Sequence, residues 1–573
     1  MKRLLLFSAM LFTSGLLIAQ TQATQAYLDE NDQVQIRNVI ITDLDESRST
    51  LQQLDGFPKK MAASPSFKNM RGVALADING DGSDEILASS FNTLNVYNGD
   101  GSILWSKTLT GTAIYPPAVS ELDQAGTIGI VVVTGGVPNN GRIYLMDSNG
   151  NDVTGWPLSF ENHWIITGPV IADVTGDGIS EIICQTRTSN NLHVLKQDGT
   201  PLSDAWPFLL GGTPAITPSV GDLDNDGVME IVTGTSDGTL FALDVDGNAK
   251  LGFPVPSDGI SFSYQSPLLV DFEGDGDLSI VGTSHGDAPK FFIREKDGSY
   301  RDGWPFMIPD ASWTYAPPTV VDVTGENDFR IFMSRPIGEE PQPMLYGFYP
   351  DGSQMDNFPI VKAGGLEGFT SVADVDNDGS HDLIFGSNLK VDNLGFIHAY
   401  SMDGTEIEGF PLRPTGFTFM NGANLGDING DGIMDIVALS YELNFQPTDS
   451  IFINAYSTNV PMEDADILFG TYKGSNDRSG FVRRSSGVNT TDIASAESLR
   501  FSVDRGNVLS VYSANEINEV NVFTLSGKKV RAIRNNGSEV IRVNISDLNT
   551  GFYLIKAVMK DGSAVSSKFV ISK

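Results

Sequence analysis

Short apolar, β-branched runs alternate with clusters of Asp, Asn and Gly along most of this chain. One stretch shows the unit: an apolar run over residues 218–221 ends at an acidic loop, and further runs follow over 230–234 and 239–245. An Asp-Gly pair at 246–247 then precedes a fourth run with an aromatic–Pro pair at 253–254. Such runs between turn residues predict β-strands, and Asp-Gly pairs predict tight hairpins. The unit is therefore predicted to be four antiparallel strands.

The acidic loop recurs through the chain at a regular interval. Its leading aspartate returns at spacings of 46, 50, 49, 49, 51, 52 and 53 residues. A period of this size indicates a propeller or a solenoid, and solenoid rungs are usually shorter. Four antiparallel strands per repeat, arranged radially, make a β-propeller. The leading aspartates are Asp77, Asp123, Asp173, Asp222, Asp271, Asp322, Asp374 and Asp427.

The two ends of the repeat region predict how a ring would close. The eighth unit offers three strands, the last near residues 451–456, and no aromatic–Pro pair follows it. An unmatched Phe57-Pro58 pair stands before the first acidic loop. We expect this N-terminal segment to supply the outer strand of the last blade, which protects the sheet edges. The predicted fold class is all-β: an eight-bladed β-propeller over residues 55–473, followed by a small antiparallel β-sandwich.

The acidic loops have the ligand spacing of a calcium site. In the loop of residues 222–230, side-chain oxygens occupy positions 1, 3, 5 and 9, and Gly227 allows a sharp bend. This spacing suits Ca²⁺, a hard cation that takes about six to eight oxygen ligands in flexible geometry. A plain turn without metal is the alternative, but a turn does not need acids at all four positions. The predicted ligands are Asp77, Asn79, Asp81 and Glu85; Asp173, Thr175, Asp177 and Glu181; Asp222, Asp224, Asp226 and Glu230; Asp271, Glu273 and Asp275; Asp374, Asp376, Asp378 and Asp382; and Asp427, Asn429, Asp431 and Asp435.

Three loops depart from the full pattern. The Asp271 loop has Ser279 at position 9, so weaker binding is expected there. The loop after Asp123 is shorter and lacks the further acids. The Asp322 loop lacks the bend glycine and has Arg330 where the last carboxylate belongs. A fixed cation at that position would repel Ca²⁺ or replace it.

Over roughly residues 55–472, the repeats resemble the FG-GAP/VCBS units of integrin-α-type propellers. The resemblance rests on the signature Asp-x-Asp/Asn-x-Asp-Gly-x-x-Asp/Glu, repeated in register. It implies an extracellular, Ca²⁺-stabilised propeller used mainly for adhesion, ligand binding or scaffolding. The expected ligand is an extracellular glycan or protein.

Both ends of the chain predict export. Two basic residues precede an apolar run over residues 4–19, which predicts a secretory signal peptide of residues 1–19, or one extending to residue 23. An N-terminal anchor helix is the alternative, although the run is short for a membrane span. Residues 24–54 form an N-terminal segment, and the Gly-, Ser- and Asn-rich residues 474–496 are predicted to be a linker.

The C-terminal residues 497–573 differ in charge from the rest of the chain. They carry 11 Lys plus Arg and 7 acids, a balance of +4, whereas the whole chain has −35. Short alternating runs predict an antiparallel sandwich. Residues 522–530, 548–556 and 568–573 resemble the C-terminal sorting domain of Bacteroidetes type IX secretion cargo. The resemblance implies the type IX secretion machinery as a partner, and a secreted or outer-membrane surface location. A carbohydrate-binding or spacer sandwich is the alternative.

Composition narrows the partners and the chemistry. The excess of 72 Asp plus Glu over 37 Lys plus Arg argues against nucleic acid and anionic membranes. Cys184 is the single cysteine, so an internal disulfide is impossible. The five histidines lack a metal-ligand spacing, and no Gly-x-Ser-x-Gly elbow is present. The protein is therefore predicted not to be an enzyme. The alternative is a polysaccharide lyase of the rhamnogalacturonan-lyase type, whose members include calcium propellers.

Aromatic residues predict a ligand-binding face opposite the acidic loops. Trp164, Phe262 and Trp313 each stand nine residues before a leading aspartate, and so at the other end of the innermost strand. Exposed aromatic rings would suit stacking on sugars or capture of a protein loop. Packing between neighbouring blades is the alternative, because large aromatic residues are usually buried.

Overall fold

The computed structural model describes residues 22–28, 34–40, 51–482 and 500–571, apart from residues 66, 136–139, 287–288, 310–313, 336–337, 367, 390–393, 443, 445, 447, 504–507, 525–528, 546–547, 549–550 and 561–563. The predicted signal peptide and Trp313 lie outside the described residues. Among the described residues there is no helix with the length and apolar character needed to span a membrane.

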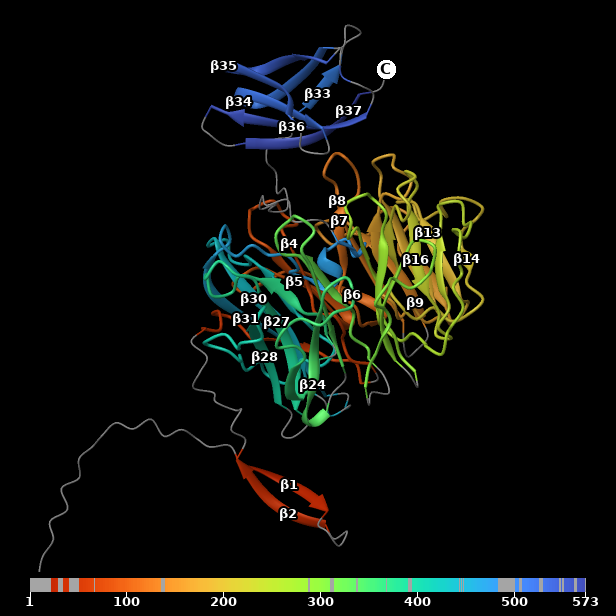
Figure 1. The fold of residues 1–573 in the computed structure, drawn as a ribbon, viewed down its shortest axis with the longest axis vertical. Coiled ribbons are helices and arrows are strands. Elements are labelled where there is room, and N and C mark those ends of the chain that lie inside the picture. Colours follow the sequence, from red (N-terminus) through yellow and green to blue (C-terminus); the bar gives the residue numbers. More distant parts are fainter. Residues whose placement is uncertain are drawn as a thin grey trace, which may run out of the picture. The chain divides into compact units, whose positions relative to one another are not determined.

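Eight sheets of three to five strands follow one another between residues 59 and 482 (Figure 1). Each sheet begins with a short innermost strand that ends at an acidic loop. The sheets are, in chain order, β4 (Ala74–Ala76), β5 (Glu85–Tyr97) and β6 (Ile103–Ala113); β7 (Ala118–Glu121), β8 (Ile128–Thr134), β9 (Asn140–Met146) and β10 (Leu158–Glu161); β11 (Val170–Ala172), β12 (Glu181–Thr186), β13 (Asn191–Leu195) and β14 (Phe208–Leu209); β15 (Ser219–Gly221), β16 (Glu230–Gly234) and β17 (Leu240–Leu243); β18 (Leu268–Val270), β19 (Ser279–Thr283), β20 (Lys290–Arg294) and β21 (Phe306–Met307), joined by β32 (Phe481–Val482); β22 (Thr319–Asp322), β23 (Phe329–Ser334), β24 (Gly338–Phe348) and β25 (Ile360–Gly364); β26 (Ser371–Ala373), β27 (Asp382–Leu389) and β28 (Leu394–Ser401); and β29 (Ala423–Gly426), β30 (Ile433–Tyr441) and β31 (Ser450–Pro461), joined by β3 (Lys59–Ala62).

The core lies between neighbouring sheets. Val170 and Val194 of the third sheet pack with Val220 and Ile231 of the fourth in one buried cluster. Because inner strands are covered on both faces, all five residues of β16 are buried. This explains the continuous apolar runs in the sequence, since a strand covered on one face only would alternate.

The aromatic–Pro pairs hold each sheet to the next. The Trp156 indole donates a hydrogen bond to the Gln197 carbonyl in the following Asp-Gly hairpin, over 2.8 Å. Trp206 and Trp304 make the same bond to the Val245 and Pro350 carbonyls, each at 2.9 Å. These indole rings are at most 7% exposed. In these three sheets the indole is therefore buried and anchors the neighbouring hairpin, whereas the Phe side chain of the other aromatic–Pro pairs has no N–H to donate.

The predicted pairing of the N-terminal segment with the last sheet is confirmed. β3 pairs antiparallel with β31, with Lys59 opposite Ile453 and Ala62 opposite Ser450. The innermost strand of this last sheet, β29, contacts β4 of the first sheet. The two ends of the repeat region thus meet, and β3 covers an outer edge that would otherwise be free to pair with another chain.

A buried ion pair reinforces this junction. Lys68 Nζ lies 2.7 Å from Asp449 Oδ2, and the two side chains are 6% and 1% exposed. Replacing Lys68 with Met is expected to lower the free energy of unfolding by about 3–5 kcal/mol, because the Asp449 charge stays buried without its partner. Denaturant unfolding of the mature protein measures this. The control Lys60→Met, at an exposed residue of β3, should change it by less than about 0.5 kcal/mol. Equal stability of the two variants would contradict the prediction.

After β31 the chain runs along the innermost strands of the sheets. Residues 469–482, here called the central segment, accept or donate hydrogen bonds along the innermost strands of seven sheets. Backbone bonds of 2.8–2.9 Å run from Val372, Leu425, Val119, Ile171, Val220 and Leu269 to the carbonyls of Phe469, Gly470, Asn476, Asp477, Ser479 and Gly480 in that order, and the Asn476 amide donates to the Leu75 carbonyl. The central segment includes a 3₁₀ turn, η2 (Tyr472–Gly474), and ends as β32, parallel to β18.

Buried cations fix the central segment. The Arg478 guanidinium, 1% exposed, donates to the carbonyls of Tyr472 (2.8 Å) and Pro117 (3.3 Å). Lys473 donates to the Pro218 carbonyl. From the first sheet, buried Arg71 donates to carbonyls before the fifth and sixth sheets. The sequence predicted residues 474–496 as a linker, whereas residues 474–482 belong to the interior of the ring.

The remaining described strands form two separate parts. β1 (Gln22–Leu28) and β2 (Val34–Ile40) make an antiparallel hairpin. The chain divides into two compact units, and the boundary follows Asn489. The second unit contains five strands that are joined into one sheet through β34. Leu509, Val520 and Ile555 lie in its buried core. Where the sequence predicted two strands over residues 508–524, β34 runs through as one. The strands are β33 (Arg500–Val503), β34 (Val508–Thr524), β35 (Lys529–Asn544), β36 (Gly551–Met559) and β37 (Ala564–Ile571).

Candidate metal-binding loops

The leading aspartate organises each acidic loop. In the first sheet, Asp77 Oδ1 accepts the Gly80 N–H at 2.6 Å and Oδ2 accepts the Gly82 N–H at 2.9 Å. Both glycines have a positive φ, of 80° and 90°. Residues other than Gly, Asn and Asp rarely adopt this backbone conformation. The Asp173 and Asp427 loops repeat both bonds at 2.7–2.8 Å. The backbone is therefore wrapped around one carboxylate. Among the described residues, three acids bring oxygens within 4.8 Å of one another in the Asp222 and Asp374 loops only.

The carboxylate at position 9 begins the second strand of the sheet and is buried. Glu85 Oε2 accepts the Ile78 N–H at 3.0 Å, and the equivalent Asp382 Oδ2 accepts the Val375 N–H at 3.0 Å. One oxygen of each group thereby fixes the loop, and the other oxygen of Glu85 accepts the Asn79 side-chain N–H at 2.6 Å. Burial, joined by the negative charges of neighbouring loop aspartates, raises the pKa of this carboxyl to about 7 in four loops: Glu85, Glu181, Asp382 and Asp435.

These four carboxyls lack a compensating cation. Among the described residues, no lysine or arginine nitrogen lies within ion-pair distance of the predicted ligands in the Asp77, Asp173, Asp374 and Asp427 loops. In the last of these, buried Asp435 Oδ1 has no hydrogen-bond partner. A cation among the acids would favour the charged forms and satisfy this oxygen. The side chains in these loops therefore fit a hard divalent ion.

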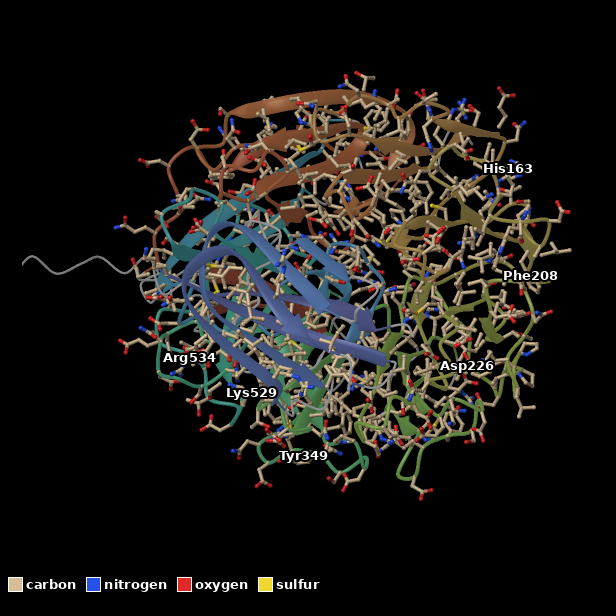
Figure 2. The ribbon with its side chains drawn as sticks, turned by 90° about the horizontal axis from the view of Figure 1, so that it is seen from above. His163, Phe208, Asp226, Tyr349, Lys529 and Arg534 are labelled. Carbon is tan, nitrogen blue, oxygen red and sulfur yellow. The ribbon has the colours of Figure 1, made fainter. Side chains whose placement is uncertain are left out.

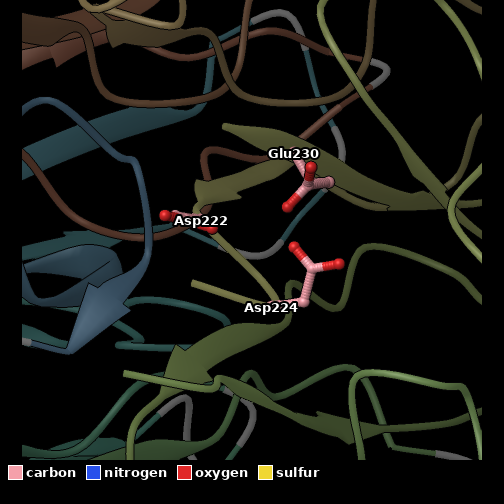
Figure 3. A group of neighbouring side chains, drawn as sticks. All are labelled: Asp222, Asp224 and Glu230. Atoms are coloured by element: carbon pink, nitrogen blue, oxygen red, sulfur yellow. The ribbon is translucent and has the colours of Figure 1, made fainter. Parts of the chain in front are cut away.

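The Asp222 loop carries the same acids but a different neighbour. Oxygens of Asp222, Asp224 and Glu230 lie within 4.8 Å of one another, and Figure 3 shows Asp224 and Glu230 turned toward each other. Lys250 Nζ reaches this group, at 2.9 Å from Asp224 Oδ1, 3.0 Å from Asp226 Oδ2 and 3.1 Å from Glu230 Oε1. Burial also raises the pKa of Glu230, but the ammonium of Lys250 acts against the rise.

Basic side chains also enter the two following loops. In the fifth sheet, Arg301 lies 2.5 Å from Glu273 and 3.2 Å from Glu295, whose other oxygen accepts the Ser279 hydroxyl at 2.9 Å. In the sixth sheet, Arg330 pairs with Asp328 at 2.5 Å and lies over the Tyr349 ring. The loop of the second sheet is a plain turn in which Asp123 accepts bonds from Ala125 and Thr127.

The loops of the first and eighth sheets open into one hollow of ≈ 890 Å³. Its walls include Asp81 and Glu85 from one loop and Asn429 from the other, together with Asp100 of an Asp-Gly hairpin. Acidic loops and hairpins therefore share a side of the ring, as the strand order requires. Asp226, from an acidic loop, and Tyr349, from a hairpin, are both exposed and are labelled in Figure 2.

The predicted ligand-binding aromatics behave differently from one another. Trp164 is half-buried and meets the edge of Phe67 at a centroid distance of 5.1 Å. Phe262 is only 3% exposed and packs in the core against Phe292, so its predicted contact with a ligand is wrong in this structure. Trp313 lies outside the described residues. Two half-buried tyrosines of the same face, Tyr264 and Tyr315, pack edge to face at 5.7 Å.

Sequence reasoning did not identify Lys250, Arg301 or the central segment. Both basic residues stand three positions before an aromatic–Pro pair, in the segment that follows the Asp-Gly hairpin. The corresponding residues of the third and seventh sheets are Ser203 and Ile407. Comparing this single position among the repeats could have identified the two cations.

Fold and loops together define an all-β protein of propeller-like repeats that ends in a separate β-domain. Residues 173–233 match the family model of the FG-GAP-like repeat, and residues 505–572 match the secretion system C-terminal sorting domain. Both predicted resemblances are thereby confirmed. The sorting domain directs type IX export to the cell surface or the medium. Neither match is to a catalytic family.

The solved structures that match this chain belong to proteins of different kinds. The V. cholerae biofilm matrix protein Bap1 is 14% identical, with 74% of this chain and 94% of that chain covered and a TM-score of 0.37. The quinohemoprotein alcohol dehydrogenase from Comamonas testosteroni is 12% identical, with 72% and 77% covered and a TM-score of 0.40. The Dos1 propeller is 9% identical, with 72% and 96% covered and a TM-score of 0.40. No curated protein matches the chain.

Proposed function

We propose that this protein is a calcium-stabilised, eight-bladed β-propeller that acts as a binding, adhesion or scaffold module at the cell surface. The observation that carries the calcium assignment is the loop geometry: backbone N–H groups wrap each loop around its leading aspartate, and in the seventh sheet oxygens of Asp374, Asp376 and Asp382 lie within 4.8 Å of one another. The raised pKa of the buried position-9 carboxyl in four loops supports it. Such a carboxyl would ionise readily beside a divalent ion. The loops of the first and third sheets each add a neutral oxygen, from Asn79 and Thr175.

The eight-blade arrangement is supported by three contacts. β3 completes the last sheet, β29 lies beside β4, and the central segment follows the innermost strands in ring order. A ring closed in this way leaves loops at two ends, one acidic and one bearing the half-buried aromatics. We propose calcium at the first end and ligand contact at the second.

The aromatic end suits a sugar ring or an extended protein loop. Phe67, Trp164, Tyr264 and Tyr315 come from different repeats and are partly buried against the core. Their ring faces would supply stacking area, while their backbone is fixed by the sheets. Trp164 is the residue on which we centre the site, since its backbone N–H donates to the Thr188 hydroxyl at 3.0 Å and fixes the main chain from which the ring projects.

Trp164→Ala is expected to abolish ligand binding while shifting the melting temperature by only a few degrees. A glycan array probed with the mature protein, in calcium and in EGTA, identifies a ligand, and titration of that ligand then compares the variants. The control Tyr349→Ala removes a 36% exposed ring at the acidic-loop end and should leave binding unchanged. A loss of about 3–5 kcal/mol in stability on Trp164→Ala would instead identify a packing residue.

A further inference from the structure

The fourth and seventh sheets offer a matched pair of acidic loops. Each brings three carboxylates together within 4.8 Å: Asp222, Asp224 and Glu230 in one, and Asp374, Asp376 and Asp382 in the other. Both loops are closed by the same bonds from the backbone to the leading aspartate, over 2.8–3.2 Å. The loops differ in position 9, which is Glu230 in one and Asp382 in the other, and in what surrounds the carboxylates.

One surrounding position differs in charge. Two backbone hydrogen bonds of 3.0 Å hold Lys250 in place. The Lys250 N–H donates to the Ala242 carbonyl, and the Lys250 carbonyl accepts the Phe253 N–H. Ile407 makes the corresponding bonds in the seventh sheet, at 2.9 and 3.3 Å. The two side chains thus leave the backbone at equivalent points. In the fourth sheet an ammonium contacts three carboxylates, and in the seventh an aliphatic side chain takes its place.

We infer that the fourth and fifth loops are closed by cations of their own sheets, Lys250 and Arg301, and take up no calcium. A divalent ion at the fourth loop would have to displace an ammonium that is 15% exposed and already makes three ion pairs. In the fifth loop the Arg301 guanidinium bridges Glu273 and Glu295, and position 9 is the neutral Ser279. Calcium binding would leave either cation close to a divalent charge, which Coulomb repulsion opposes.

This inference rests on the proposed function, because it assigns calcium to four loops and denies it to two others. It departs from the prediction that Asp222, Asp224, Asp226 and Glu230 bind calcium. The carboxylates that would bind a metal ion are the ones that form ion pairs with Lys250. The sheets around the fourth and fifth repeats would then keep their loops closed when calcium is scarce.

The test counts calcium bound by the mature full-length protein after equilibrium dialysis and elemental analysis. Wild type should bind about four ions per chain. Asp376→Asn should lose about one, whereas Asp224→Asn should lose none and Lys250→Ile should gain about one. Loss of one ion in Asp224→Asn, or no gain in folded Lys250→Ile, would overturn the inference.

Thermal melts keep the test decisive if Lys250→Ile folds poorly. Asp224→Asn should lower the melting temperature equally in calcium and in EGTA, since it removes an ion pair that needs no metal. Asp376→Asn should lower it in calcium only. Calcium-specific destabilisation by Asp224→Asn would overturn the inference. Wild-type protein that binds no calcium at all would contradict the calcium proposal itself, an outcome distinct from the others.

Discussion

Truncation of the chain after Leu468 is expected to abolish cooperative folding of the eight sheets, whereas truncation after Asn489 leaves them folded. The shorter chain lacks the central segment, so six backbone N–H groups of the innermost strands lose their carbonyl partners. An unsatisfied buried polar group costs about 1–3 kcal/mol. Loss of the buried Phe469 and Tyr472 side chains adds about 3–5 kcal/mol each. The sum, about 12–28 kcal/mol, is comparable to or larger than the 5–15 kcal/mol that stabilises a typical domain.

Circular dichroism and calorimetry of both truncated proteins would measure this effect. The longer one is the control, because it removes the second compact unit and keeps every bond of the central segment. A single variant in the full chain, Arg478→Met, should show the effect on a smaller scale, since the guanidinium bonds that join the central segment to the Pro117 carbonyl are lost. A sharp, unshifted melt of the protein that ends at Leu468 would show that the ring is stable without its interior segment.

The repeat signals in the sequence were sufficient to predict the sheets because each depends on local chemistry. An Asp-Gly pair sets a hairpin from within, and the unmatched Phe57-Pro58 pair placed β3 beside β31. The Asp77 loop likewise closes on its own backbone. The hairpins and the acidic loops need no information from distant parts of the chain, whereas the pairing of β3 with β31 was predicted by comparing the first and last repeats.

The central segment could not be predicted by the same means. Its Gly, Ser, Asn and Asp residues are those of a linker, and its ordering comes from carbonyls that meet N–H groups hundreds of residues away. The local sequence around Arg478 and Lys473 does not predict their burial, yet both are 1% exposed and donate to backbone carbonyls. The Phe262 assignment failed for a related reason, because only packing against Phe292 decides that this ring is internal.

Removal of calcium is expected to lower the melting temperature of the eight-sheet unit by about 10 °C. Each ion that binds only the folded state adds about 2.7 kcal/mol when free calcium is a hundredfold above its dissociation constant, so four sites give roughly 11 kcal/mol. The unfolding entropy is about 2.1 cal/mol/K per residue over roughly 430 residues. Dividing the free energy by this entropy gives a melting-temperature shift of about 10 °C. Calorimetry in calcium and in EGTA measures it. Asp123→Asn, in a plain turn, should leave the difference unchanged.

The same difference should depend on pH. In the metal-free protein, burial raises the pKa of Glu85, Glu181, Asp382 and Asp435 to about 7, against about 4 in an unfolded chain. Between these values the folded state binds more protons, so the free energy of unfolding in EGTA falls as pH rises from about 4 to 7. Calcium needs the ionised carboxylates and stabilises most above pH 7. The gap between the calcium and EGTA melts should therefore be small at pH 5 and large at pH 7.5, and a constant gap would show that these carboxyls are not the ligands.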